Sequence, residues 1–202
     1  ITSRCNARCS FCFIDFDNKD TFKNELNISE IKKISQNLGS TISNINITGG
    51  EPFARKDINE IGEIYLSNKN IISLFITTNG SLPNRIKEFV EFLSPKFPHK
   101  NITFSISIDH YREEHNRIRK VPELFDKCIE SYQYLQKFKK NILCNVAITV
   151  SEENYEVVTD LYEELKNKYA IDSFTATLVR DEGVYKTNKA LKLNILKSYQ
   201  NL

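Results

Sequence analysis

Three cysteines within the first twelve residues are the most distinctive chemical feature of this chain. Cys5, Cys9 and Cys12 have the spacing C-x3-C-x2-C, whereas Cys128 and Cys144 lie in apolar stretches typical of small buried side chains. Three thiolates on one short loop can converge on a metal centre. A structural zinc site needs a fourth ligand. A 4Fe–4S cluster usually takes four cysteines, so three would leave one iron open. The spacing alone leaves an iron–sulfur cluster, zinc and chance as alternatives.

Three further motifs stand where apolar runs end. Gly-Gly-Glu-Pro occupies residues 49–52, Thr-Thr-Asn-Gly occupies 77–80, and Ser-Ile-Asp occupies 107–109. Paired glycines let a backbone approach a ligand without interference from Cβ atoms. The serine hydroxyl and the aspartate carboxylate of the third motif share one face of a strand, which suits contacts to ribose hydroxyls. Each motif alone is also compatible with a simple turn or a capped strand end.

Strand and helix patterns alternate along the chain. Runs rich in β-branched residues predict strands, and apolar residues at helical spacing predict helices between them. Successive strands begin about 30 residues apart, the length of one βα unit, which indicates an α/β fold with a parallel sheet. Residues 1–3 read as the tail of a first strand, which makes six units. The other predicted strands are 42–47, 71–77, 102–108, 141–150 and 173–179, and the predicted helices cover 28–38, 58–65, 86–93, 124–135, 157–165 and 191–199.

Two helices carry a recognisable start signal. Asn27 with Glu30, and Asp57 with Glu60, match the capping-box pattern. Each therefore predicts a helix that begins at the following residue.

One face of several predicted strands is polar. Strands buried on both faces should be apolar on both, so a polar row beneath a helix-covered sheet indicates a cavity that holds a polar ligand. A solvated face is the alternative. The row consists of Ser105, Ser107, Asp109, Asn145, Thr149, Ser173, Thr175 and Thr177.

Composition excludes several classes of function. The 202 residues include 28 Lys and Arg against 26 Asp and Glu, a net charge of +2, which offers no basic footprint for nucleic acid. No apolar run approaches the ~18 residues of a membrane helix. The chain begins with Ile1 and contains no Met, so we expect a piece cut from a longer protein, in which a targeting segment would be invisible.

Taken together, the cysteine spacing with an aromatic residue before the last cysteine, Gly-Gly-Glu-Pro, Thr-Asn-Gly and Ser-x-Asp resemble the radical S-adenosylmethionine (SAM) superfamily. The resemblance covers nearly the whole chain. It implies that residues 1–202 form the core domain, a partial TIM-like (β/α)6 barrel of parallel strands. A C-terminal domain outside this chain is compatible with it.

The resemblance also implies a set of site residues. Cys5, Cys9 and Cys12 would ligate three irons of a 4Fe–4S cluster, and the methionine part of SAM would chelate the fourth. No catalytic residue of the chain itself is assigned. The expected SAM contacts are Gly49, Gly50 and Glu51 at the methionyl amino group, Phe11 beside the adenine, Ser107 and Asp109 after the fourth strand, and the backbone of Leu178.

The activity implied by the resemblance is reductive cleavage of SAM to a 5′-deoxyadenosyl radical, which abstracts hydrogen from a peptide or small-molecule substrate. The partner would be a one-electron reductant of the flavodoxin or ferredoxin type. An oxygen-sensitive reduced cluster indicates a cytoplasmic location. Alternatives are a structural or regulatory domain that binds zinc or a cluster without catalysis, and SAM-dependent methyl transfer. The segment 115–119 is expected either to contact substrate or to be a solvated loop with exposed Arg117 and Arg119.

Overall fold

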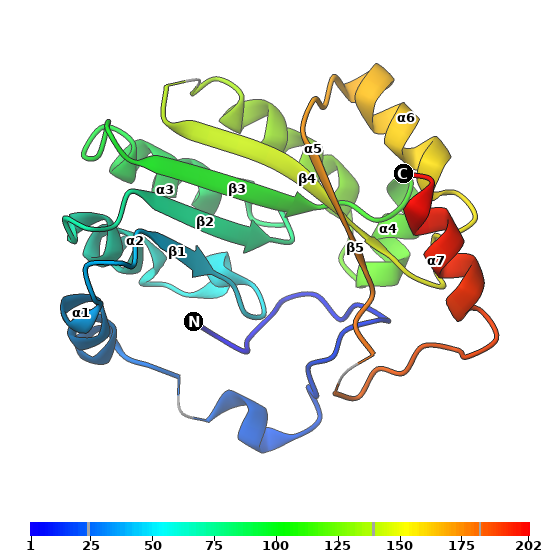
Figure 1. Cartoon of the computed structure of the whole chain (residues 1–202), viewed down its shortest axis with the longest axis horizontal. Helices are drawn as coiled ribbons and strands as arrows, with labels where there is room; N and C mark the ends of the chain where they lie inside the picture. Colours follow the sequence, from blue (N-terminus) through cyan, green and yellow to red (C-terminus); the bar gives the residue numbers. More distant parts are fainter. Residues whose placement is uncertain (24, 139, 182) are drawn as a thin grey trace.

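A five-stranded parallel sheet forms the centre of the protein in the computed structural model, which describes residues 1–23, 25–138, 140–181 and 183–202. The strands follow one another in chain order across the sheet, each joined to the next through helices (Figure 1). Their bounds are β1 (Asn44–Ile47), β2 (Ser73–Thr78), β3 (Asn101–Ser107), β4 (Ile142–Val150) and β5 (Phe174–Leu178). The sheet curls into a half-barrel, which confirms the partial TIM-like fold.

The predicted first strand is the main correction. Of residues 1–3, only Thr2 pairs with the sheet, through a single parallel bridge to Gly49 beyond the end of β1. The described chain therefore has five strands in the sheet and an N-terminal segment that runs beside their carboxyl ends (Figure 1). Because it has only this one bridge to the sheet, the N-terminal segment is held mostly by its contacts with the loops.

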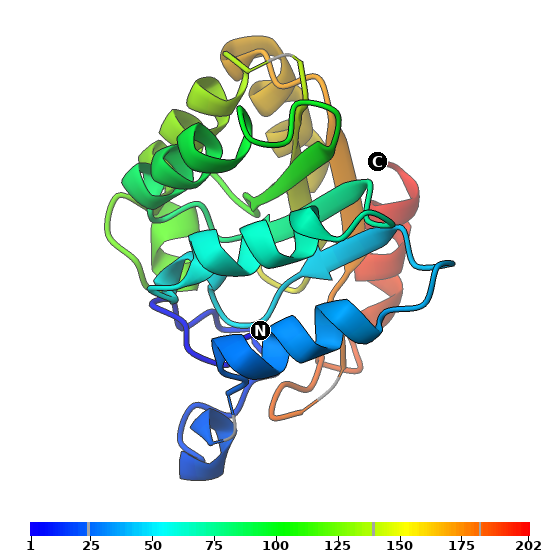
Figure 2. The ribbon, with the colours of Figure 1, turned by 90° about the vertical axis from the view of Figure 1, so that its left-hand side faces the viewer.

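Helices cover the outer face of the sheet, where the core lies. Figure 2 shows α1, α2, α3 and α5 following one another along this face. Phe53, Phe89 and Phe104 form an aromatic cluster there, with ring centroids 5.5 to 6.2 Å apart. The helices are α1 (Ile28–Asn37), α2 (Ile58–Ser67), α3 (Pro83–Leu93), α4 (Arg112–Arg119), α5 (Leu124–Leu135), α6 (Val158–Tyr169) and α7 (Lys192–Gln200), with short 3-10 turns η1 (Lys19–Phe22) and η2 (Pro52–Ala54).

The two predicted helix starts have different outcomes. Asn27 and Glu30 form the expected capping box at the start of α1. Asp57 precedes α2, but its side chain makes no capping bond. Its carboxylate instead binds Arg55, at 2.8 and 2.7 Å. The capping prediction for Asp57 is therefore wrong, because a charged neighbour outcompetes the backbone N–H groups for the carboxylate.

The inner face of the sheet carries the polar row. Ile102, Phe104 and Ile106 of β3 are fully buried toward the helices, whereas Ser105 and Ser107 point to the inner side. Register places Ser105 between Thr77 of β2 and Asn145 of β4.

None of the helices in the described residues is long and apolar enough to cross a membrane.

Helix α4 is not predicted from the sequence. Its eight residues, REEHNRIR, are dominated by charge and show one apolar side chain, so no helical stripe is visible. The expectation of a loop at residues 115–119 is wrong, because the segment lies within α4. Arg117 is exposed, as expected, and is paired with Glu114 and Glu153, whereas Arg119 is 7% exposed at the end of the helix.

Candidate functional site

The cysteine loop is docked on the C-terminal end of α4. Arg8 N donates to Arg119 O at 3.0 Å, and Ser10 N donates to Ile118 O at 3.1 Å. The last carbonyl groups of a helix lack partners within the helix, and these two bonds satisfy them. A loop with little regular structure thereby acquires a defined place at the carboxyl ends of the strands.

The three thiols of this loop are close enough to influence one another. Each is half-buried and free of disulfide bonds. Burial raises the pKa of Cys9 to about 11, and the charges of Cys12 and Cys5 contribute in the same direction. Burial also raises the pKa of Cys5. A bound metal centre would reverse this effect, because a coordinating thiol is deprotonated.

The donor set of this loop consists of three free thiols. Among the described residues, no three His, Cys, Asp or Glu side chains are placed to share one metal ion. A mononuclear zinc site requires its ligands to converge on one atom. In a cluster each thiolate binds a different iron, so the ligands lie further apart. The donor set is therefore compatible with iron–sulfur ligation.

The Gly-Gly pair approaches the N-terminal segment of the chain itself. Gly50 N donates to Thr2 O at 2.7 Å, and Glu51 N donates to Arg4 O at 2.8 Å. A Cβ atom on Gly49 would lie 2.0 Å from Thr2 O, and one on Gly50 would lie 2.1 Å from Arg4 O. The glycines are thus required where two backbones meet, and they bring the segment that leads into Cys5 against the end of β1.

Glu51 lies at the centre of the strand ends and is fully buried. Its carboxylate accepts hydrogen bonds from Asn79 N at 2.7 Å, Thr78 Oγ1 at 2.8 Å and Phe53 N at 3.0 Å. Burial raises its pKa, and these donors oppose the increase. Glu51 therefore links the loop after β1 to the end of β2.

A buried ion pair lies on the other side of the cysteine loop. Arg119 Nε and Nη2 both lie 2.7 Å from Asp109 Oδ2, and Thr149 N donates to Oδ1 at 2.9 Å. Burial alone would lower the pKa of Arg119, but the negative charges of Asp109 and Cys9 raise it above its ordinary value. The guanidinium also lies 5.7 Å from the ring centroid of Phe11.

The structure brings most of the predicted site residues to one edge of the sheet. The cysteine loop, the loop at residues 49–51 and Asp109 are joined by hydrogen bonds through Asn79 and Arg119. Ser107 is half-buried on the inner face of β3. Leu178, at the end of β5, is exposed.

Sequence reasoning missed two residues of this site. Asn79 belongs to the Thr-Thr-Asn-Gly motif, but no role was predicted for its side chain. Arg119 lies in a segment that shows no helical pattern. The Thr-Asn-Gly motif was the available signal for Asn79. For Arg119 there was none, because its burial depends on Asp109, in the loop that follows β3.

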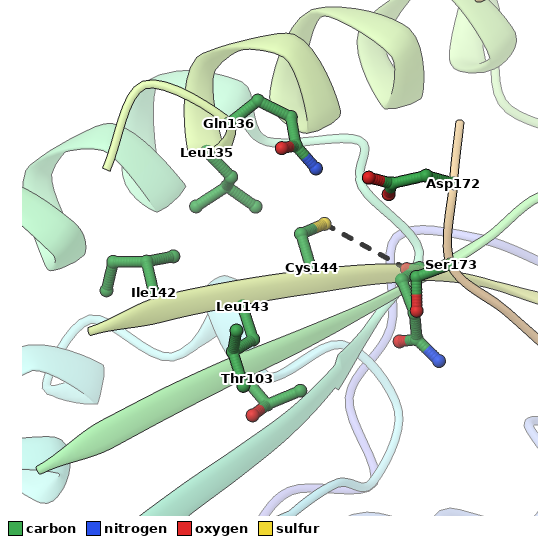
Figure 3. Close-up of a pocket in the computed structure, with 9 residues that line it drawn as sticks. Thr103, Leu135, Gln136, Ile142, Leu143, Cys144, Asp172 and Ser173 are labelled. Carbon is green, nitrogen blue, oxygen red and sulfur yellow. Dashed lines mark hydrogen bonds between the residues drawn. The ribbon is translucent and has the colours of Figure 1, made fainter. Parts of the chain in front are cut away.

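The two remaining cysteines are buried, as expected, at 0% and 9% exposure for Cys128 and Cys144. Cys144 borders a cavity of about 580 Å³ near the amino ends of β3 and β4 (Figure 3). Its sulfur faces Asn145 O at 3.9 Å. This cavity lies along the strands away from the loops that carry the cysteine motif.

Comparison with known protein families decides the classification. The profile of the Radical SAM superfamily matches residues 1–165. The chain belongs to the radical SAM superfamily. Members of this superfamily use a 4Fe–4S cluster together with SAM.

Curated relatives of this radical SAM chain are enzymes with different substrates. It is 28% identical over 171 residues to Fe-coproporphyrin III synthase of Methanosarcina barkeri, covering 82% of the chain and 40% of the relative. It is 30% identical over 176 residues to GTP 3′,8-cyclase of Aquifex aeolicus, covering 83% and 51%. It is 27% identical over 168 residues to the sporulation killing factor maturation protein SkfB of Bacillus subtilis, covering 83% and 38%. The chain thus spans about half or less of each relative.

Solved structures support the fold. The enzyme anSMEcpe, with bound AdoMet and the Kp18Cys peptide, superposes with a TM-score of 0.71 at 21% identity, covering 99% of this chain and 57% of that one. A second anSMEcpe structure with bound AdoMet gives the same TM-score at 22% identity, covering 98% and 56%. At this identity the superposition establishes the fold alone.

Proposed function

We propose that the chain is the catalytic core of a radical SAM enzyme, in which Cys5, Cys9 and Cys12 hold a 4Fe–4S cluster. The observation that carries the proposal is the seating of the three-thiol loop at the carboxyl ends of the strands, on the end of α4. Ligands in parallel α/β folds bind at these ends. The family match covers residues 1–165, which include the cysteine loop and the ends of β1 to β4.

The chain's residues would divide the work of holding the cofactors. The three cysteines would bind the cluster, and Gly49, Gly50 and Glu51 would lie at the methionyl end of SAM. Phe11, Ser107 and the backbone of Leu178 would contact the nucleoside, and Asp109, whose carboxylate is buried against Arg119, would position the ends of β3 and β4 beside it. When bound, the cluster and SAM would supply a one-electron reductive cleavage that yields a 5′-deoxyadenosyl radical for hydrogen abstraction. A protein reductant of the flavodoxin or ferredoxin type would deliver the electron, and the cytoplasm is the proposed location because such a cluster is oxygen-sensitive.

The side chains on the inner face of the sheet favour a substrate that carries no charge where it contacts the strands. None of the five strands contains an Asp, Glu, Lys, Arg or His. A buried anion requires positively charged or multiple N–H partners, and this face offers hydroxyl and amide groups instead. Asn145 is the clearest example, since its Nδ2 donates to Thr175 Oγ1 at 3.0 Å while its buried Oδ1 has no partner among the described residues. A peptide or a neutral small molecule fits this face better than a triphosphate.

Anaerobic reconstitution with iron and sulfide tests the proposed function. The native chain should bind an iron–sulfur cluster and, after reduction, release 5′-deoxyadenosine from SAM. Cys9→Ala should lose the cluster and the activity together. Cys144→Ala is the matched control, because it removes a buried cysteine near the amino ends of the strands, away from the loop, and it should keep the cluster.

Three results would contradict the proposal. A colourless protein that holds one zinc ion would favour a structural domain. S-adenosylhomocysteine as the product in place of 5′-deoxyadenosine would favour methyl transfer. An intact iron–sulfur spectrum in Cys9→Ala would refute the ligand assignment.

A further inference from the structure

Asn79, at the end of β2, connects the cysteine loop to the buried carboxylate of Glu51. Its Nδ2 donates to Asn6 Oδ1 at 3.0 Å and faces Cys5 Sγ at 3.7 Å, within the range of an N–H···S hydrogen bond. Its backbone N donates to Glu51 Oε2 at 2.7 Å. One residue therefore contacts both a predicted iron ligand and a predicted SAM-binding element.

The orientation of the Asn79 amide is set by its surroundings. Oδ1 accepts a hydrogen bond from Ser81 N at 2.9 Å, which identifies the oxygen end of the amide. Cys128 Sγ lies 3.1 Å from the backbone carbonyl of Asn79 and fixes the main chain at that point. The side chain is 6% exposed, so water does not compete freely for the amide. The N–H group is consequently directed at the sulfur of Cys5.

A hydrogen bond to a ligating sulfur changes how readily a cluster accepts an electron. The N–H dipole stabilises negative charge on the thiolate, and the reduced cluster carries one more negative charge than the oxidised cluster. The bond therefore favours the reduced form and raises the reduction potential. Within the described residues, Cys5 is the one loop cysteine whose sulfur receives such bonds, from Ala7 N at 3.3 Å and from Asn79.

We propose that Asn79 is a positioning residue that holds the sulfur of Cys5 and raises the midpoint potential of the cluster. The inference rests on the proposed function, since it requires the cysteine loop to bind an iron–sulfur cluster. It concerns the protein without substrate, so its test needs no knowledge of the substrate.

The test compares midpoint potentials of the reconstituted 202-residue chains by anaerobic titration monitored by EPR. Asn79→Leu removes the donor, keeps a side chain branched at Cγ, and leaves the backbone bond to Glu51 in place. Ser81→Ala is the matched control, because it deletes the bond from Asn6 Nδ2 to Ser81 Oγ in the same network and touches no sulfur. We expect Asn79→Leu to shift the midpoint to more negative potential and Ser81→Ala to leave it at the native value.

The outcomes separate the two proposals. Failure of the native chain to assemble a cluster refutes the proposed function. A cluster whose potential is the same in Asn79→Leu overturns the inference alone. An equal shift in Asn79→Leu and Ser81→Ala also overturns it, because the cause would then be displacement of the loop.

A second measurement applies if Asn79→Leu does not bind iron. The native chain is labelled with ¹⁵N in the asparagine side-chain amides, and pulsed EPR of the reduced cluster reports nitrogen coupled through the hydrogen bond to sulfur. A resolved ¹⁵N coupling that survives in Ser81→Ala supports the assignment to Asn79. Absence of the coupling in the native chain overturns it.

Discussion

Arg119 places two nitrogen atoms, Nε and Nη2, 2.7 Å from a single oxygen of Asp109, in a part of the protein where Asp109 is 0% exposed. The other oxygen of Asp109 accepts a bond from Thr149 N, so both carboxylate oxygens have protein partners. The backbone carbonyl of Arg119 in turn holds Arg8 of the cysteine loop. This ion pair thus joins the ends of β3 and β4 to the loop that carries the proposed cluster ligands.

Removal of Asp109 should be more harmful than removal of the whole pair. Asp109→Ala leaves the guanidinium of Arg119 buried without a counter-charge, which we expect to cost about 3–5 kcal/mol of unfolding free energy. The double variant Asp109→Leu/Arg119→Leu should lose less than the single variant, because no charge remains unpaired. Urea unfolding of the three proteins measures these differences. A double variant as unstable as Asp109→Ala would show that the pair stabilises the fold through geometry and not through charge.

Gly50 should not tolerate a side chain. In Gly50→Ala the new Cβ would lie 2.1 Å from Arg4 O, so the N-terminal segment must move. We expect the unfolding free energy to fall by more than about 1 kcal/mol. We also expect reduced iron loading, because the displaced segment leads directly into Cys5. Gly39→Ala is the control, since its Cβ would meet only Thr41 Oγ1 at 3.9 Å and should change stability by about 0.5 kcal/mol or less. Equal stability and iron content in the two variants would contradict this account.

His115 should make the folded protein sensitive to acid. It is fully buried, and its Nδ1 accepts a hydrogen bond from Asp109 N at 3.2 Å. Burial holds the pKa of His115 well below its usual value of 6.5. Below that pH the unfolded chain binds a proton that the folded chain excludes, so stability falls as the pH decreases, by up to about 1.4 kcal/mol per pH unit.

The variant His115→Asn keeps an acceptor for Asp109 N and removes the titrating group. Its unfolding free energy, measured by urea between about pH 7.5 and pH 5.5, should decrease less steeply than that of the native chain. Burial also lowers the pKa of His110, but His110 is present in both proteins, so the difference in slope isolates His115. Identical slopes would show that His115 is already charged in the fold or exposed to solvent.

Asn145 and Asn141 offer a comparison between an unpartnered and a satisfied buried amide. In the part of the chain that the structure describes, Asn145 Oδ1 is buried without a partner, whereas Asn141 accepts from Ser94 Oγ at 2.7 Å and donates to Phe97 O at 3.1 Å. We expect Asn145→Leu to raise the unfolding free energy by about 1 kcal/mol, since a desolvated polar atom disappears. Asn141→Leu should lower it by about 1–3 kcal/mol. Thermal and urea unfolding test both, and a loss of stability in Asn145→Leu would show that its amide supports the fold.

The order of the elements could be predicted because their signals are local. The strand β3 is visible in the alternation of residues 102–108, and α1 is visible in its apolar stripe and its Asn27–Glu30 box. The helix α4 was missed because its single apolar residue, Ile118, is too little for a periodic pattern. The first strand was overpredicted, because the spacing of the βα units places a strand before the cysteine loop, whereas residues 1–3 have only one pairing partner in space.

The amino-acid sequence by itself determined the cysteine spacing, the family to which that spacing belongs and the sites at which strands end. These properties depend on residues within a few positions of one another. Only the tertiary structure decided that Arg119 is buried against Asp109, that Gly50 faces Arg4 and that the Asn79 amide is aimed at Cys5. Each of these contacts joins different loops or helices, and its energy depends on burial and distance that arise only when the sheet has brought those segments together.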